Sequence, residues 1–330
     1  MTPALVPTKD PLGCTIPVEF VVCFSLLGVT SQFETNSREI LDACRASFGS
    51  YGECSPRTRS PLLKIRLLVD ESFTATPPWG EVVFRRQGDL LYASAGSENV
   101  AVADLRRRQA FGFISPAMAG DFDFLQRNFL ECLTFTLMTR GHGATHTYVH
   151  ASAVAKGNNG LILSGPRESG KSTLAYACSR RGFKIVADDV VYLRSVRSMT
   201  AWGKPWRLRL LPDCGRLFPE LREKAESTRR AGKEVVEIDV QEFMPGTAQA
   251  SCVPRALFFL QRSSVRTTCE PLGADEALEL LRRDMVYDSP EVIERHRRVW
   301  TALVKRGSFV LRWHGTPEEA VDLLVPFLDS

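Results

Sequence analysis

The sequence lacks any Cys-x-x-Cys pair, and its 5 histidines form no group with cysteines at zinc-ligand spacing, although the chain contains 9 cysteines. An odd number of scattered cysteines argues against a disulfide framework and against a structural zinc site. We therefore expect reduced thiols and a cytoplasmic protein.

Long lysine runs are also missing, and the formal net charge is only +4. This charge is lower than expected for a dedicated nucleic-acid binder, so we expect no nucleic-acid partner. Three short groups of arginines occur, at 106–108, 229–230 and 295–298. We interpret them as solvated surfaces, with binding of an acidic or phosphorylated partner as the alternative.

No apolar run is long enough for a membrane helix. The nearest candidate, CTIPVEFVVCFSLLG at residues 14–28, is interrupted by Glu19 and is too short to span a bilayer. No strongly basic segment of the signal-peptide kind precedes it. We expect a buried strand at this position and no membrane partner.

Internal repeats and low-complexity segments are absent from the 330 residues, of which 44% are hydrophobic and 24% charged. This composition and length predict two packed domains. The boundary is expected after residue 140, because the helix expected at 122–138 ends before Gly141 and Gly143. Residues 1–140 are expected to form a smaller α+β domain, with partner recognition as its candidate role. Its expected strands are 18–27, 64–69, 81–85 and 90–94, and its expected helices are 37–46 and 122–138.

Residues 141–330 have the pattern of an α/β domain. Strands are expected at 147–154 and 160–164, followed by a glycine-rich loop, a helix and a strand at 183–186. This order is typical of a parallel α/β sheet. Further strands are expected at 206–211, 234–238 and 256–261, and three helices begin after Gly273, at Ser289 and at Thr316.

The stretch GPRESGKST matches the phosphate-loop pattern G-x-x-x-x-G-K-[ST]. Glycines let backbone N–H groups turn inward around an anion, and the following helix directs its positive end to the same place. Lys171 can neutralise the β- and γ-phosphates, and the Ser172 hydroxyl can bind Mg²⁺. The expected nucleotide-contacting residues are Gly165, Pro166, Arg167, Glu168, Ser169, Gly170, Lys171, Ser172 and Thr173.

Two adjacent aspartates, Asp188 and Asp189, follow the next predicted strand. At the carboxyl end of such a strand, one carboxylate can hold Mg²⁺ and the other can accept a proton from an attacking hydroxyl. His150 is a candidate for orienting a carboxylate or touching the transferred phosphoryl group, with a structural histidine as the alternative. His146 would pair with it only if this segment were helical, which the β-branched residues around it argue against.

Three segments in this order resemble the catalytic core of HPr kinase/phosphorylase and related proteins: HASAV from residue 150, GLILSGPRESGKST from residue 160, and RGFKIVADDV from residue 181. The resemblance implies a P-loop kinase domain of the HPr kinase and PEP carboxykinase type that transfers phosphoryl from ATP, or from pyrophosphate in some members, to a serine of a protein or peptide. It implies Asp188 as catalytic base, Asp189 and Ser172 at the metal, and His150 and Lys171 as catalytic partners. The reverse assignment of the two aspartates stays open.

The family's second signature is not legible in this sequence. WGKPWRLRLL stands at residues 202–211 instead, where Lys204, Arg207 and Arg209 could clamp phosphate oxygens or could simply be solvated. HPr is therefore not the expected acceptor. The leading hypothesis is an ATP- and Mg²⁺-dependent serine kinase, which could form a homo-oligomer. The alternatives are a kinase of a small hydroxylated metabolite and a nucleotide-gated binding module without transfer.

Overall fold

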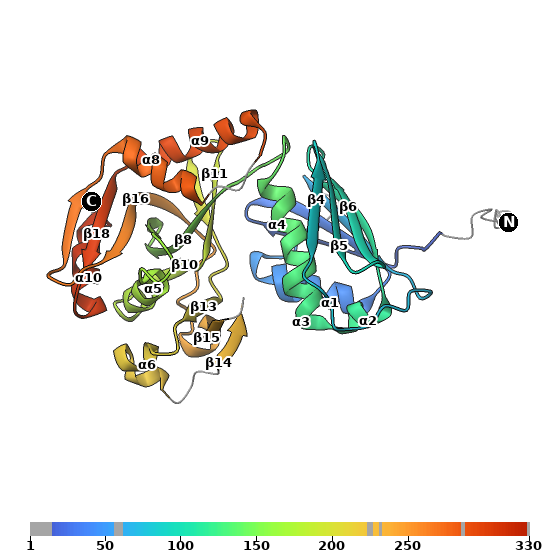
Figure 1. Cartoon of the computed structure of the whole chain (residues 1–330), viewed down its shortest axis with the longest axis horizontal. Helices are drawn as coiled ribbons and strands as arrows, with labels where there is room; N and C mark the ends of the chain where they lie inside the picture. Colours follow the sequence, from blue (N-terminus) through green and yellow to red (C-terminus); the bar gives the residue numbers. More distant parts are fainter. Residues whose placement is uncertain (1–14, 56–61, 223–226, 231–232, 285–287, 329–330) are drawn as a thin grey trace. The chain divides into compact units, whose positions relative to one another are not determined.

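The computed structural model describes residues 15–55, 62–222, 227–230, 233–284 and 288–328, with only the backbone given for 227–230 and 233. The chain divides into two units, Met1–Ala144 and Thr145–Ser330 (Figure 1). The boundary expected from the sequence lies after residue 140. The architecture is mixed α/β with several sheets.

The first unit contains a seven-stranded mixed sheet in the order β1-β2-β3-β7-β6-β5-β4, in which β3 is parallel to β2 and β7. Three of its strands, β2, β6 and β7, were not expected from the sequence. The strands are β1 (Phe20–Leu26), β2 (Val29–Thr35), β3 (Leu63–Val69), β4 (Val83–Gln87), β5 (Leu90–Ala95), β6 (Asn99–Asp104) and β7 (Gln109–Ile114).

The helices of the first unit are α1 (Arg38–Phe48), α2 (Pro116–Gly120), α3 (Phe122–Phe124) and α4 (Glu131–Thr139), with short 3-10 and π-helical segments at Gly49–Tyr51 and Leu125–Leu130. The single helix expected at 122–138 is thus interrupted by a π-helical turn. Phe48 of α1 contacts the rings of Phe24, Phe33 and Phe135, which joins β1, β2, α1 and α4 in one aromatic core.

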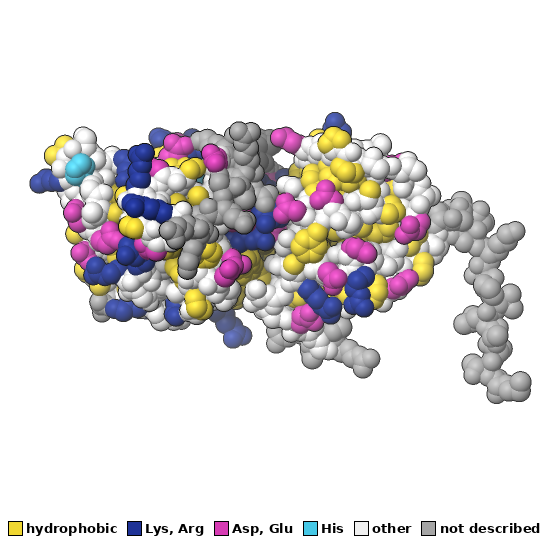
Figure 2. All heavy atoms as spheres, turned by 90° about the horizontal axis from the view of Figure 1, so that it is seen from below, with side chains coloured by type: hydrophobic (Ala, Val, Ile, Leu, Met, Phe, Trp, Pro, Cys, Tyr) yellow, Lys and Arg dark blue, Asp and Glu magenta, His cyan; other side chains and the backbone are white. Residues whose placement is uncertain are grey.

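Part of the sheet in the first unit exposes apolar side chains. Tyr92, Val102 and Phe111 are neighbours across β5, β6 and β7 and are 37%, 52% and 44% exposed. Figure 2 shows hydrophobic side chains at the surface of this unit, and acidic and basic side chains interspersed over the face in view. Partner recognition by this unit stays a prediction.

The second unit is built on an eight-stranded sheet. Its main path runs β10-β8-β11-β12-β16-β18-β17, and β9 pairs with both β8 and β16. The strands are β8 (Thr147–Lys156), β9 (Asn159–Ser164), β10 (Lys184–Ala187), β11 (Val190–Ser195), β12 (Met199–Trp202), β16 (Ser251–Arg262), β17 (Thr268–Pro271) and β18 (Ser308–Trp313). A separate three-stranded sheet has the order β13-β15-β14, with β13 at Arg207–Leu210, β14 at Ser227–Arg230 and β15 at Lys233–Asp239.

The sheet of the second unit is mixed, whereas the strand, loop, helix and strand order is typical of a parallel one. β9 is parallel to β16, and β16 is parallel to β18, but the antiparallel strand β8 lies between β9 and β10. After β9, the loop and the helix that follows it therefore cross over β8, and the chain rejoins the sheet as β10 on the other side of β8. Periodicity and element order do not reveal this, because strand order depends on pairings between distant segments.

Helices cover both faces of this sheet (Figure 1). Leu161, Leu163 and Phe258 pack with α5 (Lys171–Arg180) and α10 (Pro317–Leu324). Their strand neighbours Ile162 and Leu257 pack with α8 (Ala274–Arg283) and α9 (Pro290–Val304). Burial on both faces explains why these strands are continuous apolar runs rather than alternating ones. The remaining short helices are α6 (Cys214–Leu217), α7 (Val240–Phe243), Pro219–Leu221 and Val325–Phe327.

Within the described ranges, none of the helices has the length and apolar character that crossing a membrane requires.

Glu34 provides a test of the energetics of the first unit. Its buried carboxylate lies 2.6 Å from Lys64 Nζ and 2.6 Å from Arg66 Nη2, and Gln32 donates a hydrogen bond to it. Burial raises the pKa of Glu34, but the hydrogen bonds from Lys64, Arg66 and Gln32 outweigh burial and lower it below its ordinary value. The ionised form is therefore favoured in the folded state.

We predict that Glu34→Gln lowers the free energy of unfolding by about 1–2 kcal/mol at pH 7. Because the pKa is lowered on folding, this difference is fully present above the ordinary glutamate value of about 4.3 and disappears as the pH falls through the lowered value. Urea unfolding of the full chain across this pH range measures it. Glu53→Gln is the matched control, since Glu53 pairs with Arg45 at 3.0 Å with both side chains about half exposed. Equal effects of the two substitutions would contradict the prediction.

Candidate functional site

The glycine-rich loop connects the end of β9 at Ser164 to the start of α5 at Lys171. Gly165, Glu168 and Gly170 have φ angles of 144°, 66° and 98°. A Cβ at Gly165 would lie 2.8 Å from the carbonyl oxygen of Leu260, and one at Gly170 would collide with the Trp313 ring. Both glycines are therefore required by positive φ and by close approach of neighbouring groups.

Lys171 is buried at the first position of α5, with an exposed fraction of 8%. Its Nζ donates to the carbonyl oxygens of Gly165 at 2.8 Å and Pro166 at 3.0 Å, so the side chain folds back across the loop. Burial lowers the pKa of Lys171, although the nearby charges of Asp188 and Asp189 act in the opposite direction. An anion placed in the loop would relieve this penalty.

Ser169 presents a second buried polar group in the loop. Its hydroxyl has no hydrogen-bond partner among the described residues, and the residue is 4% exposed. Such a group costs free energy unless a ligand or water satisfies it. The loop residues Pro166, Arg167 and Glu168 are exposed, and Ser172 and Thr173 are partly buried.

Asp188 lies at the break between β10 and β11, and its carboxylate accepts three hydrogen bonds. Ser152 Oγ and Ser172 Oγ donate to Oδ1 at 2.7 Å and 2.8 Å, and the backbone N–H of Arg209 donates to Oδ2 at 2.9 Å. Burial nevertheless raises the pKa of Asp188, and the neighbouring charge of Asp189 adds to this effect. A cation beside this carboxylate would stabilise its ionised form.

Asp189 faces a different environment from its neighbour. Its side chain is 53% exposed, with Oδ1 3.4 Å from His150 Nδ1 and Oδ2 3.6 Å from Arg209 Nη1. His150 belongs to β8, where it pairs with Val190 directly after the aspartates. The structure thus brings His150, Asp189 and Arg209 together at the mouth of the site, while Asp188 contacts α5.

Glu237 holds the arginines of β13. It lies directly opposite Arg209 on β15, and its carboxylate is 3.4 Å from Arg209 Nε and 3.7 Å from Arg207 Nη1. Arg207 and Arg209 therefore share one face of the strand, as alternation predicts. Glu237 and Ser152 were not selected from the sequence: Glu237 lies in no recognisable motif, and only His150 was selected from the HASAV stretch that contains Ser152.

His146 is not part of this group. It is buried, its Nδ1 lies 2.9 Å from Thr145 Oγ1, and the segment before β8 is not helical. A histidine pair of the helical kind is therefore absent at residues 146 and 150.

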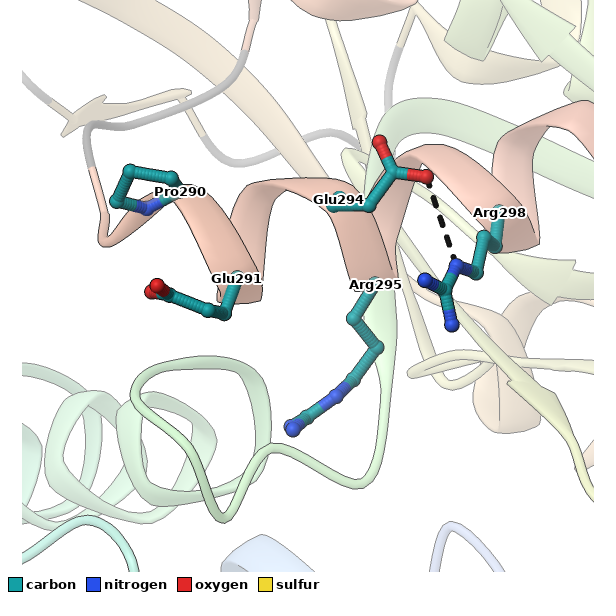
Figure 3. Close-up of a pocket in the computed structure, with 5 residues that line it drawn as sticks. All are labelled: Pro290, Glu291, Glu294, Arg295 and Arg298. Atoms are coloured by element: carbon teal, nitrogen blue, oxygen red, sulfur yellow. Dashed lines mark ion pairs between the residues drawn. The ribbon is translucent and has the colours of Figure 1, made fainter.

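A separate hollow lies along α9. Figure 3 shows the five residues that line it, including an ion pair between Glu294 and Arg298 at 3.5 Å: Pro290, Glu291, Glu294, Arg295 and Arg298. None of them belongs to the glycine-rich loop or the aspartate pair.

Among the residues that the structure describes, no group of three or more His, Cys, Asp or Glu side chains could enclose a metal ion. Mg²⁺ does not need such a cage, because it commonly takes one or two protein oxygens and completes its shell with water and phosphate. The adjoining oxygens of Asp188 and Ser172 suit this type of binding.

No protein-family model and no curated protein matches the sequence. Among solved structures, the chain is similar to the HPr(Ser) kinase/phosphatase from Coxiella burnetii, with 15% sequence identity and a TM-score of 0.28. The match covers 55% of this chain and 87% of that chain. These values are too low to assign a family or an activity.

The close approach at Gly170 can be tested by substitution. We predict that Gly170→Ala destabilises the chain by about 2–4 kcal/mol, because it adds both positive-φ strain and a collision with Trp313. Gly182→Ala is the control: Gly182 also has a positive φ of 84°, but its added Cβ would meet nothing within 4 Å. Its expected cost is about 1–2 kcal/mol, from strain alone. Thermal or urea unfolding measures both, and equal costs would refute the packing argument.

Proposed function

We propose that the chain is an ATP- and Mg²⁺-dependent kinase whose acceptor is a serine hydroxyl of a protein or peptide. The observation that carries this proposal is the 2.8 Å hydrogen bond between Ser172 and Asp188. It unites a loop of phosphate-binding pattern with a carboxylate that follows the next strand. A hydroxyl of the phosphate loop and an aspartate after a neighbouring strand are the residues that hold Mg²⁺ in P-loop phosphoryl-transfer proteins.

The loop of residues 165–170 is the proposed phosphate cradle. Its backbone and the first turn of α5 supply N–H donors, and Lys171 supplies a buried positive charge. The buried hydroxyl of Ser169 is a further donor without a partner among the described residues. These groups favour an anion, and a nucleoside triphosphate presents one of suitable size and charge.

Asp188 and Ser172 are the proposed metal ligands. Both offer the hard oxygen atoms that Mg²⁺ prefers, and Ser152 holds the carboxylate in place. Bound there, Mg²⁺ would neutralise charge on the β- and γ-phosphates.

Asp189 is the proposed base. This reverses the roles expected from the sequence, for a geometric reason. Both oxygens of Asp188 already accept hydrogen bonds, whereas Asp189 is half exposed and accessible to an incoming hydroxyl. Asp189 would take the proton as the serine oxygen bonds to the γ-phosphorus and the bond from that phosphorus to the bridging oxygen of ADP breaks.

His150 and Arg209 are proposed to orient Asp189, since they lie on either side of its carboxylate. Arg209 is also positioned by its ion pair with Glu237 and could stabilise charge on the transferred group. The nature of the acceptor, the homo-oligomer, the cytoplasmic location and the lack of a nucleic-acid partner all stay predictions.

Three substitutions separate the proposed roles. We predict that Lys171→Ala weakens Mg-ATP binding about 10–100-fold, through loss of a charged hydrogen-bond donor. Asp188→Asn should abolish the dependence of nucleotide binding on Mg²⁺. Asp189→Asn should leave binding within about 3-fold but lower transfer by roughly 10²–10⁴-fold, as removal of a general base does. Calorimetry measures nucleotide binding with and without Mg²⁺. Incorporation of label from γ-labelled ATP into the acceptor measures transfer.

Asp322→Asn is the matched control, because Asp322 is an exposed aspartate on α10 that pairs with Arg181 at 2.8 Å. The opposite result would contradict this assignment: if Asp189→Asn retains normal transfer while Asp188→Asn binds Mg-ATP normally but transfers nothing, Asp188 is the base, as the sequence resemblance implies.

The acceptor is tested with γ-labelled ATP and a library of serine-containing peptides, alongside the same library with alanine in place of serine. Label in phosphoserine of the first library alone supports the proposal. Label in small molecules would indicate the metabolite kinase. Nucleotide binding without any labelled product would indicate a binding module.

A further inference from the structure

Trp313 packs against the glycine-rich loop although it is far from Gly170 in sequence. It is the last residue of β18 and has an exposed fraction of 0%. Parallel pairing sets Ser164 of β9 beside Phe259 of β16, and Arg262 of β16 beside Trp313. The carboxyl ends of these strands therefore meet where the loop begins.

The indole contacts the loop in two ways. Its Nε1 donates a hydrogen bond of 2.9 Å to the carbonyl oxygen of Ser169. Its ring also packs so closely on Gly170 that no side chain could be accommodated there. One aromatic residue thus fixes both sides of the peptide bond between Ser169 and Gly170.

This contact also fixes the direction of a backbone donor. The peptide bond between Ser169 and Gly170 is trans, so its C=O and N–H point in opposite directions. Because the carbonyl is held toward Trp313, the Gly170 N–H is directed away from the indole. Rotation of this peptide would break the Trp313 hydrogen bond, so the indole restrains the orientation of a donor at the start of α5.

Arg262 holds the indole from another direction. Its guanidinium carbon lies 3.4 Å from the centre of the Trp313 ring, a stacked cation–π arrangement. Burial against the ring lowers the pKa of Arg262, with the charge of Asp213 acting against this shift. The stack leaves the indole little freedom to move away from the loop.

We propose that Trp313 is a positioning residue for phosphate binding: it acts through the peptide between Ser169 and Gly170 and does not touch the nucleotide. This inference rests on the proposed function, since it assumes that the loop binds a nucleotide. It names a residue that lies in no phosphate-loop motif.

The test compares two tryptophans. Trp313→Phe keeps an aromatic ring but removes the N–H that holds Ser169. Trp300→Phe is the matched control, because Trp300 is also buried and its Nε1 lies 3.4 Å from a backbone carbonyl oxygen, that of Tyr148 on β8. We expect Mg-ADP and Mg-ATP to bind about 5–10-fold more weakly to Trp313→Phe, and with unchanged affinity to Trp300→Phe. Calorimetry measures affinity, and urea unfolding of both variants measures stability.

Equal nucleotide affinity of Trp313→Phe and the wild type would overturn the inference and leave the proposed function standing. Failure of the wild type to bind Mg-ADP or Mg-ATP would overturn both. A purely structural role predicts a loss of stability without a loss of affinity in the folded protein, which also counts against the inference.

A second measurement does not depend on the Trp313 variant being folded. The chain has 5 tryptophans, and their indole N–H signals can be resolved by ¹⁵N labelling and assigned with single substitutions of the other four. Addition of Mg-ADP to the wild type should shift the Trp313 signal and leave the Trp300 signal in place. An unchanged Trp313 signal at saturating Mg-ADP would contradict the inference.

Discussion

The carboxylate of Asp188 is the constraint on which the site depends, because it joins three separate elements. Ser152 reaches it from β8, Ser172 from α5, and the backbone N–H of Arg209 from β13. One side chain thus fixes the helix after the loop, the central sheet and the three-stranded sheet relative to one another. Replacing the carboxylate by a group with fewer acceptor sites would leave at least one of these donors without its partner.

The same carboxylate and Lys171 attract each other, but burial disfavours the charge on each of them. Burial raises the pKa of Asp188 and lowers that of Lys171, so desolvation disfavours the charged form of both groups. Their opposite charges offset only part of this cost. A phosphate beside Lys171 and a cation beside Asp188 would each supply the missing counter-charge.

Local sequence was sufficient for some parts of the site but not for others. Gly165, Gly170, Lys171 and Ser172 form one motif, and the aspartates follow the next strand at a recognisable spacing. The sequence could not show that β8 separates β9 from β10, because strand order depends on long-range pairing. Ser152, Glu237 and Trp313 were missed for the same reason. Glu237 and Trp313 lie on strands that carry no motif, and Ser152 lies in the HASAV stretch, where only His150 was selected.

The different environments of the two aspartates could not be read from the sequence, since adjacent residues of identical type give no signal of which side chain is buried. β10 and β11 both pair with β8 and follow one another along it, with Ala187 opposite Ala153 and Val190 opposite His150. The two aspartates lie between β10 and β11 and interrupt this pairing. At this interruption the Asp188 carboxylate points toward Ser152 and Ser172, and the Asp189 carboxylate is exposed at the surface.

Backbone strain explains how this interruption is achieved. Asp189 has a φ of 74°, and the N–H of Val190 bonds to the carbonyl oxygen of Asp188 at 3.0 Å, which closes a tight three-residue turn. In the described part of the second unit, the only other non-glycine residue with positive φ is Glu168, in the glycine-rich loop. Positive φ at non-glycine residues costs on the order of 1–3 kcal/mol and persists only where surrounding contacts enforce it. Among the described residues of this unit, positive φ at a non-glycine residue thus occurs only in the glycine-rich loop and at the aspartate pair, and the hydrogen bond between Ser172 and Asp188 connects the helix after the loop to that pair.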